Sequence, residues 1–144
     1  MNILLVEDNE GDIELTARAF KKGNLLSTLS VTNDGVEALE YLSRRGKFGD
    51  AAAPDFILLD INMPRMDGRR FLEVVKQDEK LKSIPVIMLT SSSAPRDIQD
   101  CYERHANCYI LKPFDAGKYV DMAKQIESFW VNMVQLPSKG AVGL

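Results

Sequence analysis

The 144-residue sequence predicts a single α/β domain built around one parallel β-sheet. Short apolar runs alternate along the chain with longer segments of helical periodicity, and this strand–helix pair occurs five times in succession. Several of the runs are continuously apolar, which is typical of central strands that helices cover on both faces. A chain of this size most naturally forms a flavodoxin-like, doubly wound five-stranded sheet with strand order 2-1-3-4-5 and five helices.

Five apolar runs are the expected strands. They lie at residues 3–6, 29–31, 56–59, 85–89 and 108–111. The first, third and fourth runs are apolar throughout rather than alternating, so we expect them to be buried on both sides.

Helical spacing and end signals mark the segments between these runs. Asp34, followed by a glutamate three residues later, is the expected cap of the second helix. The third helix opens near Gly68, and Pro95 starts the fourth, with Ser93 as its expected cap. Asp115 is the expected cap of the fifth. The apolar stripes of four helices are Ile13, Ala17 and Phe20; Val36, Leu39 and Leu42; Phe71, Val74 and Val75; and Tyr119, Ala123, Ile126, Trp130 and Met133.

One domain accounts for nearly all of the chain. We expect residues 1–136 to form it and residues 137–144 to be a flexible C-terminal tail. Residues 44–54 are expected to form a long polar loop before the third strand.

The composition argues against several classes of protein. The net charge is −3, whereas a general nucleic-acid binder usually has a basic surface. No apolar run reaches the ~18 residues that span a bilayer, and the N-terminus, which turns acidic at Glu7, is not a secretory signal. Cys101 and Cys108 have no metal-type spacing and are expected to be free thiols in a reducing compartment. We therefore expect a cytoplasmic protein that binds neither nucleic acid nor membrane.

Acidic residues follow two of the expected strands. Glu7 and Asp8 come directly after the first, and Asp60 comes directly after the third. In a doubly wound sheet these strands flank the point where the strand order reverses, so the three carboxylates converge in one crevice. A hard divalent cation relieves their mutual repulsion. Oxygen-only ligands with open positions favour Mg²⁺ over a dedicated Ca²⁺ cage or Zn²⁺.

Thr90 and Lys112 complete the candidate site. They follow the fourth and fifth strands, at the same edge of the sheet. A carboxylate such as that of Asp60 can act as a nucleophile and form an aspartyl phosphate. Mg²⁺, the Lys112 ammonium and the Thr90 hydroxyl would then each face a phosphoryl oxygen, so the site would act by positioning and charge neutralisation. The acidic start and the lack of a P-loop or G-x-G-x-x-G motif disfavour binding of a flavin phosphate or a nucleotide.

Motifs in a fixed order resemble those of response-regulator receiver domains of bacterial two-component signalling. The matching segments are LLVED at 4–8, LLDINMPRMDG at 58–68, VIMLTSSS at 86–93 and YILKP at 109–113. The resemblance extends over roughly residues 2–133. More narrowly, the ILLVEDN opening, the extended loop before the third strand and the aromatic end of the fifth helix are similar to single-domain regulators paired with bacterial phytochromes.

This resemblance implies roles in phosphorylation and switching. It makes Asp60 the phosphorylated residue, Lys112 the partner of the phosphoryl group and Thr90 the switch hydroxyl. Tyr109 matches the aromatic residue that changes rotamer with Thr90. The Lys112–Pro113 peptide bond is expected to be cis, as in similar domains.

The resemblance also implies the metal ligands. Asp8 and Asp60 would bind Mg²⁺ directly, Glu7 would assist partly through water, and the backbone carbonyl of Asn62 would supply a further ligand. The acidic pair is Glu-Asp where many members have Asp-Asp, a difference that can alter water-mediated contacts without abolishing metal binding.

The resemblance further implies a signalling protein and not an enzyme. A sensor histidine kinase, of the phytochrome type on the narrower likeness, would donate a phosphoryl group to Asp60. The chemistry of the protein would be limited to self-phosphorylation and dephosphorylation. Output would pass through the face of helix four, strand five and helix five. We expect a homodimer through this face, because Phe129, Trp130 and Met133 exceed what the sheet can cover.

Two other functions stay open at this point. A haloacid-dehalogenase-type phosphatase also uses an aspartate nucleophile with Mg²⁺, Thr and Lys, but it needs an acid two residues later, where this chain has Asn62. A receiver-like protein that is never phosphorylated is disfavoured by the intact acids, hydroxyl and lysine. His105, the only histidine, is expected in the fourth helix, away from the crevice, in a surface or packing role.

Overall fold

A five-stranded parallel sheet forms the centre of this computed structural model, which describes residues 1–23 and 27–137. The strands are β1 (Asn2–Val6), β2 (Thr28–Thr32), β3 (Phe56–Leu59), β4 (Val86–Thr90) and β5 (Cys108–Leu111). Their order across the sheet is β2-β1-β3-β4-β5, and each neighbouring pair is parallel. The predicted doubly wound fold and its strand order are confirmed.

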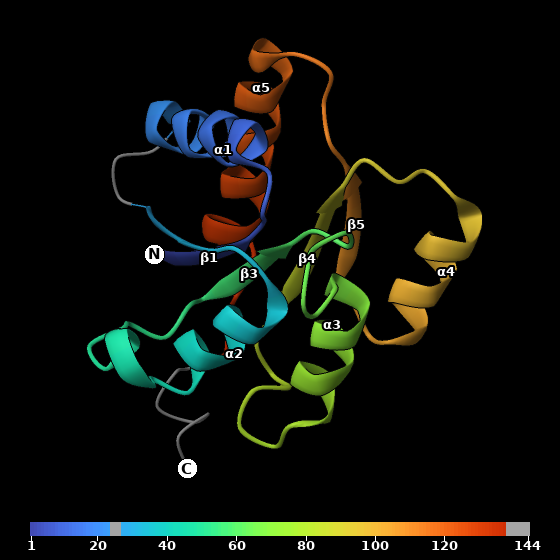
Figure 1. Cartoon of the computed structure of the whole chain (residues 1–144). Helices are drawn as coiled ribbons and strands as arrows, with labels where there is room; N and C mark the ends of the chain where they lie inside the picture. Colours follow the sequence, from blue (N-terminus) through green and yellow to red (C-terminus); the bar gives the residue numbers. More distant parts are fainter. Residues whose placement is uncertain (24–26, 138–144) are drawn as a thin grey trace.

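Helices cover both faces of the sheet (Figure 1). In the described residues they are α1 (Glu10–Gly23), α2 (Gly35–Leu42), α3 (Gly68–Gln77), α4 (Pro95–Glu103) and α5 (Ala116–Ile126). The helices α1 and α5 pack together on one face, and α2, α3 and α4 lie on the other. Because successive strand side chains point to opposite faces, Ile3 and Leu5 join the first layer, and Leu4 and Val6 join the second. The central strands are therefore apolar throughout.

Side-chain caps fix where three of the helices begin. Asp34, Asp67 and Asp115 each accept a hydrogen bond from the backbone N–H three residues later, at 2.9, 3.0 and 2.8 Å. These contacts satisfy N–H groups that have no partner within their own helix. The predicted caps of α2 and α5 are confirmed, as is the start of α3 at Gly68.

The start of α4 differs from the prediction. Ala94 occupies the N-cap position without a side-chain hydrogen bond, and Pro95 follows in the first turn. The expected Ser93 cap is therefore wrong. Ser92 interacts with this turn instead, because its hydroxyl donates to Asp97 at 2.5 Å and lies 3.4 Å from the Ala94 nitrogen. A first-turn proline has no N–H to satisfy, so α4 depends less on a cap than its neighbours do.

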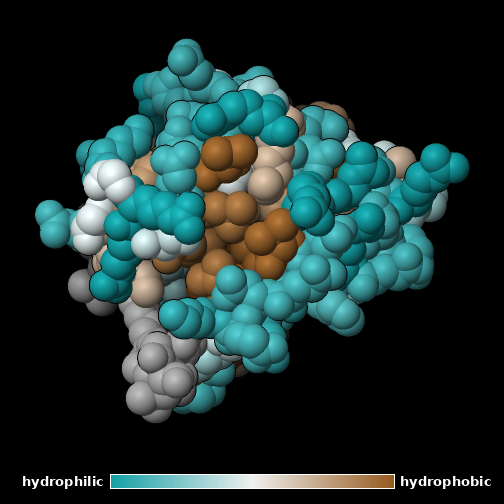
Figure 2. All heavy atoms as spheres, turned by 60° about the horizontal axis from the view of Figure 1, so that its bottom comes forward, coloured by the Kyte–Doolittle hydropathy of each residue, from teal (hydrophilic) through white to brown (hydrophobic). Residues whose placement is uncertain are grey.

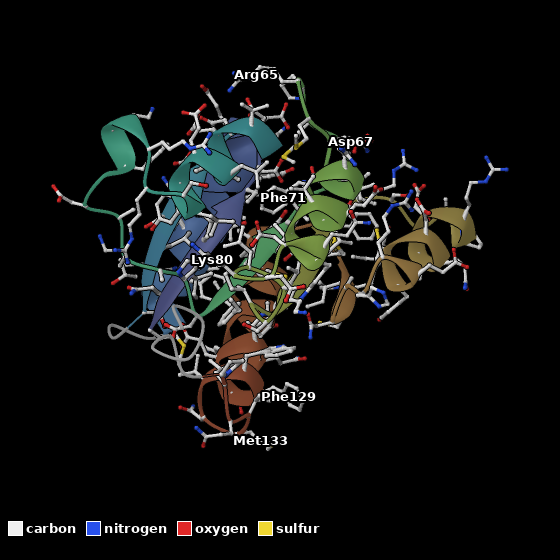
Figure 3. The ribbon with its side chains drawn as sticks, turned by 90° about the horizontal axis from the view of Figure 1, so that it is seen from below. Arg65, Asp67, Phe71, Lys80, Phe129 and Met133 are labelled. Atoms are coloured by element: carbon white, nitrogen blue, oxygen red, sulfur yellow. The ribbon has the colours of Figure 1, made fainter. Side chains whose placement is uncertain are left out.

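The chain does not keep a regular helical period after α5. The next turn, η2 (Glu127–Val131), is a π-type turn, which holds more residues per turn than an α-helix. The predicted apolar stripe therefore leaves the core here. Trp130 is half-buried against Phe56, with ring centroids 6.2 Å apart, whereas Met133 is 73% exposed. Figure 3 labels Phe129 and Met133 at this end of the molecule, where the sheet does not cover them.

The predicted polar loop at residues 44–54 contains a short 3₁₀ turn, η1 (Gly46–Phe48). Phe48 packs against Tyr41 of α2, with ring centroids 5.3 Å apart, and the Tyr41 hydroxyl donates to the Ala52 carbonyl at 3.1 Å. The loop thus borders a hollow of about 520 Å³ beside α2. Figure 2 turns this side of the molecule forward and shows apolar side chains gathered at its centre, surrounded by hydrophilic ones.

An ion pair between Arg65 and Asp34 connects the loop between β3 and α3 to the start of α2. The Arg65 guanidinium donates to both carboxylate oxygens of Asp34, at 2.8 and 3.1 Å, from a left-handed backbone with φ of 61°. Burial favours the neutral carboxyl, but the hydrogen bonds from Arg65 and from backbone N–H groups, together with the charge of Arg65, outweigh it and lower the pKa of Asp34. Beside the pair, the Gly35 N–H donates to the Met66 carbonyl at 3.1 Å. Two loops at the carboxyl edge of the sheet are thereby joined.

Three further expectations concern the chain as a whole. The tail predicted at 137–144 falls outside the described residues apart from Pro137. Within the described ranges, no helix is long and apolar enough to cross a membrane. Cys101 and Cys108 are free thiols, the first buried and the second half-buried.

We predict that Gly68→Ala destabilises the fold. A Cβ at this position would collide with the backbone of Asp60 and Ile61, both of which are buried. The free energy of unfolding, measured by urea denaturation, should fall by about 1–3 kcal/mol. In the matched control Gly49→Ala, the added Cβ would make only an ordinary contact at 3.7 Å. Its effect should stay within about 0.5 kcal/mol, and equal losses in the two variants would contradict the prediction.

Candidate functional site

The predicted site residues meet at the carboxyl edge of the sheet. An open cleft of about 680 Å³ lies there, and Asp8, Asp60, Asn62 and Lys112 line it. These residues follow β1, β3 and β5, which end at Val6, Leu59 and Leu111. The cleft lies where the strand order reverses, as the doubly wound fold predicts.

Three carboxylates lie together in this cleft. One oxygen each from Glu7, Asp8 and Asp60 lies within 4.8 Å of the others. Glu7 and Asp60 are buried, with 2% and 6% of their surface exposed, whereas Asp8 is exposed. An all-oxygen donor set suits a hard divalent cation, and the exposed carboxylate gives such an ion an approach from solvent. The residues present therefore fit a divalent cation.

The Lys112 ammonium contacts three carboxylates. Its Nζ lies 2.5 Å from Glu7 Oε1, 2.8 Å from Asp12 Oδ2 and 3.2 Å from Asp60 Oδ2. Burial alone would lower the pKa of Lys112, but the hydrogen bonds to Asp12 and Glu7 and the charge of Asp60 raise it above its ordinary value. Lys112 is thus a permanent positive charge beside Asp60, where it can neutralise developing negative charge.

Glu7 is buried, and its carboxylate contacts Lys112 and two backbone N–H groups. Burial raises the pKa of Glu7 to about 7, although the hydrogen bond to Lys112 opposes this rise. Its Oε2 atom accepts hydrogen bonds from the Asp8 and Asn9 N–H groups at 3.1 and 3.2 Å. The water-mediated metal contact implied for Glu7 stays a prediction, and the structure adds its direct pairing with Lys112.

Asp60 is held in one orientation. Its N–H donates to the Val6 carbonyl at 3.1 Å, which joins it to the end of β1. Its Oδ1 atom accepts from the Ile61 N–H at 2.8 Å, and its Oδ2 atom faces Lys112. Asn62, two residues further on, is exposed in the same cleft. The Asp60 carboxylate is therefore ordered and still borders space that is open to solvent.

Thr90 and Tyr109 are connected through one residue, Ser92. Thr90 is fully buried at the end of β4, and its hydroxyl oxygen accepts from the Ser92 N–H at 3.4 Å. The Tyr109 hydroxyl donates to the Ser92 carbonyl at 2.8 Å, and the pKa of Tyr109 is raised, chiefly by burial. The Ser92 hydroxyl donates to Asp97 of α4. The two predicted switch residues thus share a hydrogen-bond partner.

Asp12 is the site residue that the sequence analysis missed. It lies in the first turn of α1 and reaches Lys112 from there. Asp12 and Lys112 are 100 positions apart in the sequence, and no local pattern indicates their contact.

The Lys112–Pro113 peptide bond is trans, and the described residues contain no cis peptide bond. The expected cis form is therefore wrong. An X–Pro bond favours trans by about 0.5–1 kcal/mol, and the Lys112 side chain reaches Asp60 with the bond in this form.

An ordered aspartate beside a lysine ammonium and a cation-binding group of acids is the arrangement expected of a protein that accepts a phosphoryl group. A comparison with protein families agrees, because residues 3–124 match the response regulator receiver domain. The chain belongs to this family. Receiver domains are phosphoacceptors that interact with sensor histidine kinases.

Individual relatives match along almost the whole chain. Response regulator Rcp1 of Synechocystis sp. is 39% identical over 136 residues, which are 94% of this chain and 92% of Rcp1. The crystal structure of the Mn²⁺-bound form of Rcp1 has a TM-score of 0.87 and covers 95% of this chain and 99% of that one. The phosphorylated cyanobacterial phytochrome response regulator RcpA is 41% identical, with a TM-score of 0.89 and coverage of 95% and 98%. The chain is therefore similar to phytochrome-associated regulators.

We predict that a divalent cation stabilises the metal-free protein through the acidic cluster. An ion that binds only the folded state adds about 1.4 kcal/mol at about ten times its Kd. Asp8→Asn, which removes the exposed carboxylate of the cluster, should lose most of the rise in Tm that Mg²⁺ or Mn²⁺ produces in thermal scans. Asp121→Asn removes the same charge from an exposed position of α5 and should keep the rise. Similar rises in both variants would contradict the assignment.

Proposed function

We propose that this protein is a single-domain response regulator in which Asp60 accepts a phosphoryl group from the phosphohistidine of a sensor histidine kinase. One observation carries the proposal: the buried Asp60 carboxylate lies 3.2 Å from the Lys112 ammonium, in a cleft open to solvent. The match over 94% of this chain and 92% of Rcp1 supports action as a single domain.

Asp60 suits the role of acceptor better than its acidic neighbours. Glu7 has one oxygen engaged by two backbone N–H groups, and its pKa is raised to about 7 by burial, so it is less often a free carboxylate. Among the described ion pairs, Lys112 contacts Asp60 and not Asp8. A phosphoryl group on Asp60 would therefore arrive beside a positive charge already in place.

Transfer to Asp60 needs little covalent chemistry from the protein. A carboxylate oxygen of Asp60 attacks the phosphorus of the phosphohistidine. The new O–P bond forms as the N–P bond breaks, and the bonding electron pair leaves with the imidazole nitrogen. The Lys112 ammonium neutralises charge on the phosphoryl oxygens, and the Thr90 hydroxyl donates to one of them.

We propose Mg²⁺ as the cation of the acidic cluster. Its ligands would be Glu7, Asp8, Asp60 and the backbone carbonyl of Asn62. When bound, it supplies a further positive charge for the phosphoryl oxygens. Mg²⁺ retains several waters and needs few protein carboxylates, which suits an open cleft. The Mn²⁺-bound form of Rcp1 supports a divalent-ion site, because Mn²⁺ prefers similar oxygen ligands.

Phosphorylation would be read out through Thr90 and Tyr109. The phosphoryl group adds charge and strong acceptors, and Thr90 would move toward them. Ser92 is hydrogen-bonded to both residues, so its loop would move together with Thr90. Tyr109 would turn into the space that Thr90 leaves. The face of α4, β5 and α5 would then favour different partners, through a shift between two packings of the same chain.

The site supports a phosphoacceptor without turnover of other substrates. A haloacid-dehalogenase-type phosphatase requires an acid two residues after its nucleophile, and Asn62 stands there. The receiver-family match over residues 3–124 also argues against a phosphatase. The likeness to RcpA, a phytochrome response regulator, supports a phytochrome-type kinase as donor. The site of action would be the cytoplasm, with protein partners and neither nucleic acid nor membrane.

We predict that Asp60→Asn abolishes phosphorylation. With Mg²⁺ and a phosphorylated histidine kinase or phosphoramidate, the wild-type protein should gain the mass of one phosphoryl group. The variant should gain none, because the amide is not a carboxylate nucleophile. Asp50→Asn removes an exposed loop acid and should be labelled like the wild type. Full labelling of Asp60→Asn in intact-protein mass spectrometry would refute Asp60 as the acceptor.

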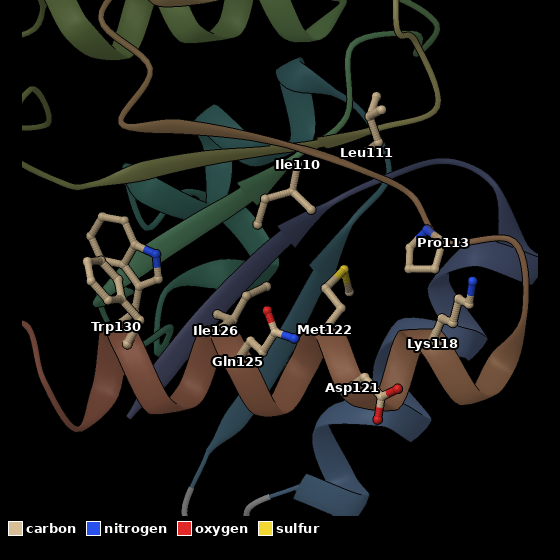
Figure 4. A pocket seen from close by; sticks show the side chains of 10 residues that line it. Ile110, Leu111, Pro113, Lys118, Asp121, Met122, Gln125, Ile126 and Trp130 are labelled. Carbon is tan, nitrogen blue, oxygen red and sulfur yellow. The ribbon is translucent and has the colours of Figure 1, made fainter.

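We also propose that two copies pair through the face of α4, β5 and α5. A hollow of about 530 Å³ lies between β5 and α5, and Figure 4 shows Ile110 of β5 and Met122 and Ile126 of α5 pointing into the gap. Leu111 and Phe129 line it and are 48% and 50% exposed, and Met133 beyond them is 73% exposed. Apolar side chains gathered on one face in this way mark an interaction surface.

We predict that Phe129→Glu prevents this dimer. Wild-type protein treated with beryllofluoride, which mimics the phosphoryl group, should have the mass of a dimer in light scattering. The variant should be monomeric, because the new carboxylate would lose its hydration in an apolar contact. Gln77→Glu adds the same charge at the exposed end of α3 and should still dimerise. A monomeric wild type with and without beryllofluoride would rule the dimer out.

A further inference from the structure

Asp12 brings another carboxylate to the site, from an element that supplies none of the predicted site residues. Its Oδ2 lies 2.8 Å from Lys112 Nζ, closer than the Asp60 oxygen at 3.2 Å. The Lys112 side chain is 8% exposed and that of Asp12 is 29% exposed. The contact is therefore partly shielded from water, which strengthens the attraction between the two charges.

The structure leaves Asp12 little freedom. Its N–H donates to the Asn9 side chain at 2.9 Å, and its carbonyl accepts from the Thr16 hydroxyl at 2.8 Å. Tyr119 of α5, which is 2% exposed, has its pKa raised to about 12, first by burial and next by the negative charge of Asp12. Asp12 thus lies in the first turn of α1, the helix that packs on α5 (Figure 1), and contacts Lys112 from there.

The three carboxylates that contact Lys112 differ in their other tasks. Glu7 and Asp60 belong to the group of acids that fits a cation, and Asp60 is also the proposed acceptor. Asp12 is outside that group in the described residues. Asp12 is therefore the carboxylate that can hold Lys112 without giving up another function.

We infer that Asp12 is a positioning residue that holds the Lys112 ammonium beside Asp60 before the phosphoryl group arrives. Lysine carries its charge at the end of a flexible stem, so fixing the charge in advance removes an ordering step from the transfer. The inference rests on the proposed function, because it concerns the same phosphoryl-transfer site. The alternative is that the Asp12 charge repels the incoming phosphoryl oxygens. Removal of this charge would then increase the rate of phosphorylation.

Two substitutions of Asp12 separate its hydrogen-bond acceptor from its charge. Asp12→Ala removes both, whereas Asp12→Asn removes the charge and keeps an oxygen that can accept from the ammonium. Glu14→Ala is the matched control, because Glu14 is on the same helix, 62% exposed at its side chain and paired with Arg18. It removes one charge from α1 without touching Lys112.

The first measurement is the rate of phosphorylation of the full chain by phosphoramidate with Mg²⁺, followed by intact-protein mass spectrometry. This small donor makes the rate independent of contact with a kinase. Asp12→Ala should react about tenfold more slowly than the wild type, and Asp12→Asn and Glu14→Ala should stay within about twofold. A wild-type or faster rate in Asp12→Ala would overturn the inference.

The second measurement needs no phosphorylation and no metal. In ¹⁵N NMR spectra of the metal-free protein, the Lys112 ammonium of the wild type should exchange slowly with water, because three carboxylates hold it. Exchange should be faster in Asp12→Ala and unchanged in Glu14→Ala. A lower Tm of Asp12→Ala with unchanged exchange and rate would assign Asp12 a purely structural role and overturn the inference. If the folded wild type is not phosphorylated but the exchange of the Lys112 ammonium depends on Asp12, the proposed function is wrong. The positioning of Lys112 by Asp12 is then still supported.

Discussion

The Lys112 ammonium is the charge on which the arrangement of the cleft depends. Glu7, Asp12 and Asp60 all contact it, and two of these carboxylates are almost fully buried. Buried acids this close cannot all remain ionised without a partner, because each would pay the cost of lost hydration and of its neighbours' repulsion. The place of Lys112 is set by the backbone, since its N–H donates to the Thr90 carbonyl at 2.9 Å and extends the pairing of β4 with β5.

Much of this arrangement could be predicted, because the sheet imposes it. The central strands must be apolar on both faces, and that pattern is readable in the sequence. Polar residues directly after such strands must lie at one edge, so the meeting of Glu7, Asp8 and Asp60 is predictable from the sequence. The helix caps Asp34 and Asp115 were predictable for a similar reason, since they serve local hydrogen bonds.

The features that escaped prediction depend on contacts between distant segments. Asp12 reaches Lys112 across 100 positions of sequence, and no local pattern records that approach. Met133 left the apolar stripe because a π-type turn changed the helical period before it. At the start of α4, Ser92 and not Ser93 makes the polar contact, because the loop also has to present the Ser92 carbonyl to Tyr109.

Ser92 has a consequence for how sharply the protein can respond. Its N–H, carbonyl and hydroxyl are bonded to Thr90, Tyr109 and Asp97, and Asp97 is paired with Arg69 of α3 at 3.3 Å. A small displacement of this residue would weaken three hydrogen bonds together, so halfway positions are unfavourable compared with either end state. In the switch proposed above, this loop would therefore have two stable positions and few intermediate ones. Partial phosphorylation would then change the fraction of molecules in each state and not the displacement within each molecule.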